Sequence, residues 1–285
     1  MSRDWAESQK TVISNELARW PFSRDKAEHM SSSKAPVGFL IVAFLMLWLP
    51  LGQHQFLYDH WMKVGTFMAP FLLFLAFAWR TIDTPLDTDT KLLSALMLVF
   101  YIIHQFEEHW IDVFGNIYAF QGYLNTTLRS NLGSADPSIN LITKADIFVI
   151  NTSLVWLAAC IAIFNAPKNL FPALCIVGII FINALSHIVS SLRDLHYNPG
   201  LVTSVLIFLP FALWFYRAAV KRQVASRKHI LLGLGWALIG HVILIAGLIM
   251  KNHLGYISPT GYYAALLIWS VVPLTVDVPG SDKAD

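Results

Sequence analysis

Residues 91–113 read KLLSALMLVFYIIHQFEEHWIDV, an apolar run that carries two histidines and two glutamates near its end. A helix rises about 1.5 Å per residue, so about 20 such residues cross about 30 Å of hydrocarbon. The run therefore predicts a transmembrane helix. Each charged group at the centre of such a helix costs roughly 2.5 to 3.5 kcal/mol, so these polar side chains are expected to have a function.

The composition of the whole chain predicts the same class of protein. Of its 285 residues, 56% are hydrophobic and only 13% are charged, and the mean hydropathy is +0.56. This is too apolar for an ordinary soluble domain. The formal net charge of +2 is small, and the chain shows no Gly-rich phosphate loop and no basic-aromatic stripe, which argues against nucleic acid as a partner.

Eight apolar runs are long enough to span a bilayer, which predicts an all-α fold, a polytopic membrane bundle of about eight transmembrane helices. The last run is the weakest, because Pro273 and Asp277 crowd its end, so seven spans are the alternative. The eight runs cover residues 36–56, 63–80, 91–113, 146–166, 170–192, 200–219, 229–250 and 261–277.

Positive residues predict the orientation of the bundle. With a cytoplasmic N-terminus and eight spans, fifteen of the twenty Lys and Arg residues fall on the cytoplasmic side and five on the other, as the positive-inside rule requires. We expect a multi-pass integral membrane protein surrounded by membrane lipids. Its membrane would be the endoplasmic reticulum in a eukaryote, and the inner or plasma membrane in a bacterium.

The predicted organisation has three parts. Residues 1–35 form a cytoplasmic segment, with either an interfacial amphipathic helix or a flexible tail; residues 36–277 form the helix bundle, and residues 278–285 a polar tail. Within the bundle, the longest connection, residues 115–144, is polar and is predicted to be an outward-facing loop.

The polar residues of the opening run share one helix face. At 100° per residue, Glu108 lies about 40° and Glu107 about 60° from His104. One helix therefore offers an imidazole and two carboxylates to the interior of the bundle.

Other runs contribute polar groups at a similar depth. Asn183 and His187 share a face of the run 170–192, with Tyr197 just beyond it, and His241 interrupts the apolar run 229–250. From helix rise, His104, Glu108, His187 and His241 all lie about 20 to 25 Å from the cytoplasmic ends of their runs. The sequence therefore predicts one site in the outward half of the bundle.

Histidines combined with carboxylates are the ligands that divalent transition metals take in proteins. We therefore predict a site for one divalent metal ion, zinc or iron, with four ligands: His104, Glu108, His187 and His241. The residues predicted to act in catalysis are Glu107, Glu108, Asn183 and Tyr197. Two alternatives remain open: metal-free acid/base or proton-relay chemistry, and a hydrogen-bonded network that only fixes the register of the helices.

These residues resemble the motif of the HXXEE family of integral membrane proteins. The resemblance covers residues 90–220 and implies that the matched positions form one site, without naming a reaction. The matched residues are His104, Glu107 and Glu108, then Asn183 and His187, then Tyr197, Pro199 and Gly200.

The leading hypothesis is a membrane-embedded enzyme that acts on a hydrophobic or lipid-like small molecule, by hydrolysis if zinc is bound or by oxidation if iron is bound. A metal-free isomerase or cyclase is the first alternative. A proton- or metal-coupled transporter is the second, although no internal repeat and no pair of broken spans supports it.

Overall fold

The computed structural model describes residues 54–78, 85–87, 89–134, 136–276 and 278. The chain divides into two compact units, Met1–Val42 and Ala43–Asp285, and all of the described residues lie in the second. The predictions for residues 1–35, for most of the run 36–56 and for the tail beyond residue 278 fall outside the described residues.

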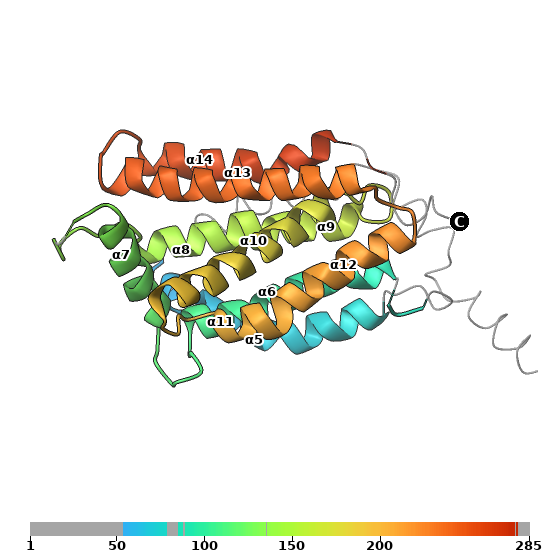
Figure 1. Cartoon of the computed structure of the whole chain (residues 1–285), viewed down its shortest axis with the longest axis horizontal. Coiled ribbons are helices and arrows are strands. Elements are labelled where there is room, and N and C mark those ends of the chain that lie inside the picture. Colours follow the sequence, from blue (N-terminus) through green and yellow to red (C-terminus); the bar gives the residue numbers. More distant parts are fainter. Residues whose placement is uncertain (1–53, 79–84, 88, 135, 277, 279–285) are drawn as a thin grey trace, which may run out of the picture. The chain divides into compact units, whose positions relative to one another are not determined.

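The described residues form an all-helical bundle without a β-strand, as predicted (Figure 1). Two of its long helices change to π-helix along their length. The elements in chain order are α5 (Gln55–Ala78), α6 (Thr90–His109), α7 (Ala119–Asn131), α8 (Lys144–Ile150) with η2 (Asn151–Leu157) and α9 (Ala158–Asn165), α10 (Phe171–Asp194), α11 (Leu201–Thr203) with η3 (Ser204–Phe208) and α12 (Leu209–Lys221), α13 (Arg227–Asn252), α14 (Pro259–Val271) and η4 (Val272–Thr275).

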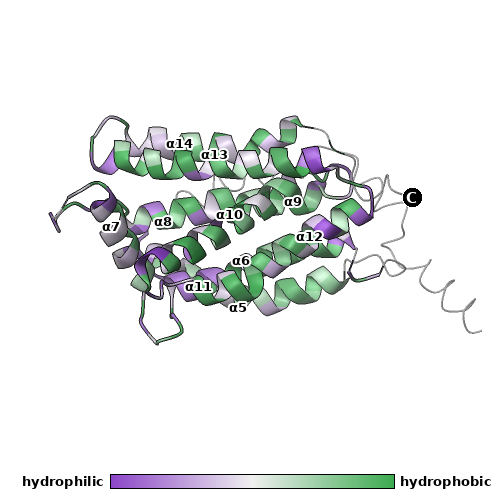
Figure 2. Cartoon of the chain, in the orientation of Figure 1, coloured by the Kyte–Doolittle hydropathy of each residue, from purple (hydrophilic) through white to green (hydrophobic). Residues whose placement is uncertain are grey.

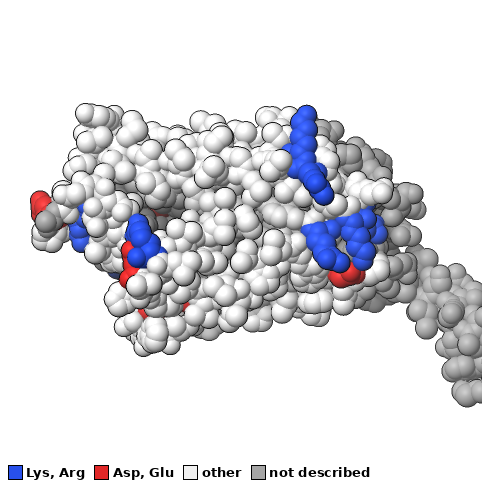
Figure 3. All heavy atoms as spheres, in the orientation of Figure 1, with Lys and Arg blue, Asp and Glu red and all other residues white. Residues whose placement is uncertain are grey.

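Among the described residues, five helices are long and apolar enough to cross a membrane. They correspond to five of the predicted apolar runs and cover Gln55–Ala78, Lys144–Asn165, Phe171–Asp194, Leu201–Lys221 and Arg227–Asn252. Figure 2 shows hydrophobic residues along most of their length. On the face drawn in Figure 3, the described charged side chains gather at two ends, near α7 and near the α12–α13 turn, with an uncharged band between them.

Three predicted elements differ from the structure. The helix α6 is present but is not one of the five, because its last turns are rich in Gln, Glu and His. The predicted eighth span is only the 13-residue helix α14 followed by a 3-10 turn, about 20 Å of helix against about 30 Å of hydrocarbon. The predicted loop 115–144 contains the helix α7, which its polar composition did not indicate.

The helix α6 lies at the centre of the bundle. Asp89 begins it by accepting hydrogen bonds from the backbone N–H groups of Lys91 and Leu92, both 3.0 Å long, and nearly all of its side chains are buried. Both π-helical segments, η2 and η3, pack against it. Single π-helical turns inside α-helices are frequent at functional sites, because they rotate the residues that follow.

The helices α10 and α13 pack closely against each other through glycines. A Cβ atom added to Gly178 would lie 2.9 Å from the carbonyl oxygen of Gly233, and one added to Gly233 would lie 3.1 Å from the carbonyl oxygen of Leu174. The two backbones therefore approach each other as closely as small residues allow, which is a common way for membrane helices to associate.

This contact predicts the effect of a larger side chain. Gly233→Leu should lower the free energy of unfolding by about 1–3 kcal/mol, because the new side chain meets backbone atoms that cannot move aside. The measurement is the melting temperature of the purified protein in detergent. Gly235→Leu is the matched control on the same helix, since no atom lies within 4 Å of the Cβ that it adds; equal melting temperatures for the two variants would contradict the close packing.

Candidate functional site

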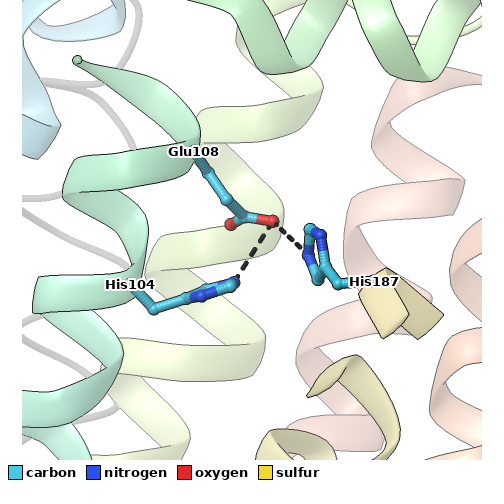
Figure 4. A group of neighbouring side chains, drawn as sticks. All are labelled: His104, Glu108 and His187. Atoms are coloured by element: carbon cyan, nitrogen blue, oxygen red, sulfur yellow. Dashed lines mark hydrogen bonds and ion pairs between the residues drawn. The ribbon is translucent and has the colours of Figure 1, made fainter. Parts of the chain in front are cut away.

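Three side chains meet where α6 faces α10: His104, Glu108 and His187. Each offers one ligand atom, and these three atoms lie within 4.8 Å of one another. Oε1 of Glu108 is 3.3 Å from Nε2 of His104 and 3.0 Å from Nε2 of His187, with the carboxylate between the two imidazole rings (Figure 4). All three are buried, at 0%, 4% and 7% exposure. The structure thus brings together three of the four predicted metal ligands.

The hydrogen bonds behind His187 determine which of its nitrogens carries a proton. The side-chain N–H of Asn198 donates to the backbone carbonyl of His187, at 2.9 Å. This orients the amide so that its oxygen lies 2.5 Å from Nδ1 of His187. Because an amide oxygen only accepts, Nδ1 must carry the proton. In the neutral ring, the lone pair is then on Nε2, which faces Glu108.

His104 is fixed in the same way by Thr203 and Glu107. The hydroxyl of Thr203 lies 2.5 Å from Oε2 of Glu107 and 2.8 Å from Nδ1 of His104. A carboxylate only accepts, so the Thr203 hydroxyl donates to Glu107 and accepts from the Nδ1–H group of His104. The lone pair of His104 is therefore also on Nε2, an atom that is buried and makes no hydrogen bond among the described residues.

With both rings neutral, two imidazole lone pairs and one carboxylate oxygen point at the same small volume; with His187 protonated, its Nε2–H group donates to Oε1 of Glu108 at 3.0 Å. Three acceptors without a hydrogen between them repel one another, so this arrangement requires a cation, either a proton shared among the side chains or a metal ion. Two His and one carboxylate, each imidazole held by a hydrogen bond from its other nitrogen, is a recurrent arrangement of metal ligands and their supporting residues.

Glu107 faces away from this group and holds the turn that follows α10. Its two oxygens accept hydrogen bonds from the backbone N–H groups of Val202 and Thr203 and from the hydroxyls of Tyr197 and Thr203, at 2.5 to 3.1 Å. Burial and the Glu107 carboxylate raise the pKa of Tyr197, so this hydroxyl stays protonated and donates. The structure thus places Glu107 and Tyr197, both predicted catalytic residues, in a contact that anchors the turn.

Gly200 brings this turn against the group of three. Its φ of +97° lies in the left-handed region, which glycine adopts without strain. A Cβ atom at this position would lie 2.7 Å from Cε1 of His187, 2.9 Å from Cε1 of His104 and 2.9 Å from Cγ of Glu108. The absence of a side chain at Gly200 therefore allows the turn to close directly over the site.

His109 also belongs to the site, although the sequence did not indicate it. Its Nε2 atom lies 3.3 Å from Oε2 of Glu108 and 3.2 Å from the amide nitrogen of Asn151. That amide is oriented by a chain in which the indole N–H of Trp156 donates to Gln105 and the amide of Gln105 donates to the oxygen of Asn151, both at 2.8 Å. Asn151 therefore donates to His109, and Nε2 of His109 carries a lone pair.

A cavity of about 270 Å³ opens beside these residues, between α6, α7, η2, α10 and α13. Glu108, His109 and His187 form part of its wall, and most of the remaining lining is aliphatic or aromatic. Such a cavity, apolar with a few convergent polar groups, is typical of a binding site for a small molecule.

The remaining predicted residues, Asn183 and His241, line this cavity and do not join the group of three. The amide of Asn183 donates to the hydroxyl of Tyr101 at 3.3 Å. Nδ1 of His241 lies 2.9 Å from the carbonyl oxygen of Ala237, one turn earlier in α13. The predicted fourth metal ligand is thus placed at the cavity wall, because α13 packs mainly against α10 and not against α6.

Sequence reasoning missed the supporting roles of Asn198 and Thr203. Tyr197-Asn198-Pro199-Gly200 is typical of a turn, yet the return of this turn to the site depends on tertiary packing. The sequence did not indicate His109, because it lies about 140° from His104 on an ideal helix. The position of His109 could have indicated its role, because a residue at the end of a helix and next to Glu108 can reach the second carboxylate oxygen of that glutamate.

The fold and the site together define an all-helical, highly apolar protein with a buried His/Glu centre beside an apolar cavity. Residues 95–215 match the family model described as "Protein of unknown function with HXXEE motif". This match covers less than half of the chain and confirms the resemblance to the HXXEE family. No curated protein and no solved structure matches the chain.

The position of Gly200 gives a test of the site's geometry. Gly200→Ala should reduce the free energy of unfolding by about 1–3 kcal/mol more than Gly115→Ala, because the added methyl group collides with the two imidazoles. Both glycines have positive φ, but no atom lies within 4 Å of a Cβ at Gly115, so backbone strain is common to both variants. Melting temperatures in detergent make the comparison; equal losses would show that the turn does not press on the site.

Proposed function

We propose that His104, Glu108 and His187 bind one divalent metal ion, zinc being the first candidate, and that the protein is a multi-pass membrane enzyme acting on a hydrophobic small molecule. One observation carries this proposal: both Nε2 lone pairs and a Glu108 oxygen converge in a buried volume, and both imidazoles are fixed in that tautomer by Asn198 and Thr203. Three protein ligands with an open position are typical of catalytic zinc.

The multi-pass arrangement is supported by the five long apolar helices and by an exposed apolar face on α5. Continuous exposed apolar surface of this kind is unfavourable in water and favourable in lipid. The residues exposed on this face of α5 include Phe56, Phe67, Met68, Phe71 and Phe74.

The lining of the cavity supports the proposal of a hydrophobic substrate, because Glu108 and His187 lie in the wall of a mostly apolar space. A bound zinc ion would supply an activated water for hydrolysis, and iron on the same ligands would supply oxidation. Glu107 is not available as a general base, since it accepts four hydrogen bonds from the turn. Nε2 of His109 already accepts the hydrogen bond from Asn151, so His109 is assigned no proton-transfer step.

Metal content is the first test. The full-length protein purified in detergent should contain about one equivalent of zinc or iron, and His104→Ala and His187→Ala should each lose it, because two ligands hold a metal far less tightly than three. Elemental analysis measures the content. His241→Ala is the matched control, a histidine on the same cavity outside the group of three, and should retain the metal.

A wild-type protein that is folded, yet as free of metal as the variants after zinc is added, would overturn the metal centre. The shared cation would then be a proton, and the same residues would form a metal-free acid/base centre.

The supporting hydrogen bond from Thr203 gives an independent test. Thr203→Val should weaken zinc binding by about 10–100-fold, because His104 and Glu107 both lose the hydroxyl that orients them. Zinc affinity is measured by competition with a chelator. Thr203→Ser keeps the hydroxyl and should bind zinc within about threefold of wild type; a serine variant as weak as the valine variant would show that the hydroxyl has no such role.

A further inference from the structure

The cavity beside the candidate metal centre has polar groups at a second position. His241 on α13 and Asn183 on α10 interrupt an apolar lining, and neither belongs to the group formed by His104, Glu108 and His187. The helices α10 and α13 pack directly against each other. Polar groups at this depth in an apolar helix are unfavourable unless they are paired. The atoms of these two side chains that lack a hydrogen-bond partner therefore indicate which groups a ligand would supply.

His241, in the wall of the cavity, has an acceptor without a donor. Its Nδ1 atom lies 2.9 Å from the backbone oxygen of Ala237. A carbonyl oxygen only accepts, so Nδ1 carries the proton, and Nε2 of the neutral ring carries a lone pair. Among the described residues, none donates a hydrogen bond to this nitrogen.

Asn183 supplies a second unpaired group. Its amide nitrogen donates to the hydroxyl of Tyr101 at 3.3 Å, and its amide oxygen is buried without a hydrogen-bond partner among the described residues. Native structures contain few buried polar atoms of this kind, and each one requires an explanation such as a ligand or ordered water. The hydroxyl of Tyr123, on the same cavity, is also buried without a partner among the described residues. Two acceptors and one hydroxyl without partners indicate an occupant that can both donate and accept hydrogen bonds.

We propose that the cavity binds an apolar small molecule through a hydroxyl group, with that hydroxyl donating to Nε2 of His241. This inference rests on the proposed function for the apolar character of the substrate and adds its polar group. A carboxylate would be repelled by the two acceptors, and an ammonium would be repelled by the metal ion proposed at Glu108 and His187. A hydroxyl is neutral, donates to His241, and leaves an oxygen that can accept from the hydroxyl of Tyr123.

The substrate class that follows is a lipid-like alcohol, held between two polar positions. Its hydroxyl end lies at His241 and Asn183, and its apolar body extends along the cavity toward Glu108 and His187. The reacting part of the molecule is then at some distance from the hydroxyl, and the hydroxyl serves recognition.

The experiment compares two ligands of equal chain length, 1-decanol and its methyl ether, which lacks the donor. Calorimetric titration into metal-free, full-length protein in detergent, with the micelle alone as blank, should show the alcohol binding about tenfold more tightly than the ether. In His241→Leu this preference should fall to within about twofold, because the acceptor is gone and the ether loses nothing. His253→Leu, an exposed position at the end of the same helix, is the matched control and should keep the tenfold preference.

Three results would overturn the inference: no saturable binding of either ligand, equal affinities for both in the wild type, or an undiminished preference in His241→Leu. If His241→Leu does not fold, His241→Gln keeps an acceptor and should keep a preference for the alcohol, whereas Asn183→Leu should reduce it. Since the titrations use metal-free protein, zinc binding without alcohol preference would refute only this inference, and alcohol preference without zinc binding would refute only the metal centre.

Discussion

One proton, on the hydroxyl of Thr203, sets the direction of the hydrogen bonds that link Glu107 to His104. The carboxylate of Glu107 can only accept it, at 2.5 Å, so Thr203 must in turn accept from His104. The imidazole of His104 is thereby turned with its lone pair toward Glu108. The donor and acceptor roles of Glu107 and Thr203 thus determine which nitrogen of His104 carries the lone pair that faces Glu108.

The helix α6 carries two layers of polar contacts because its last turns are polar on every side. His104, Glu107 and Glu108 face α10 and the turn before α11, whereas Gln105 and His109 face η2. Both partners on these two sides lie at or next to a π-helical segment. Asn151 begins η2 and Thr203 immediately precedes η3, so both residues contact α6 at the points where α-helix changes to π-helix.

The sequence predicted the parts of the site that depend on one helix or on depth alone. The four-residue spacing of His104 and Glu108 placed them together, and equal depth brought His187 to them. Depth defines a layer but not the direction in which a side chain faces within it. His241 lies in that layer, yet the close contact of Gly178 with Gly233 sets how α13 packs on α10, and His241 lines the cavity instead. Similarly, no spacing rule reveals that Glu107 is engaged by backbone N–H groups almost a hundred residues later.

The contact of Gly200 with all three members of the group links two parts of the sequence that look independent. A chain with the His-x-x-Glu-Glu spacing but a larger residue at the position of Gly200 cannot build the same centre unless its turn follows another path. The glycine is therefore a practical criterion for sorting sequences that carry this motif: those that keep it are expected to share the geometry described above, and those that lack it to have a different architecture around the same three side chains.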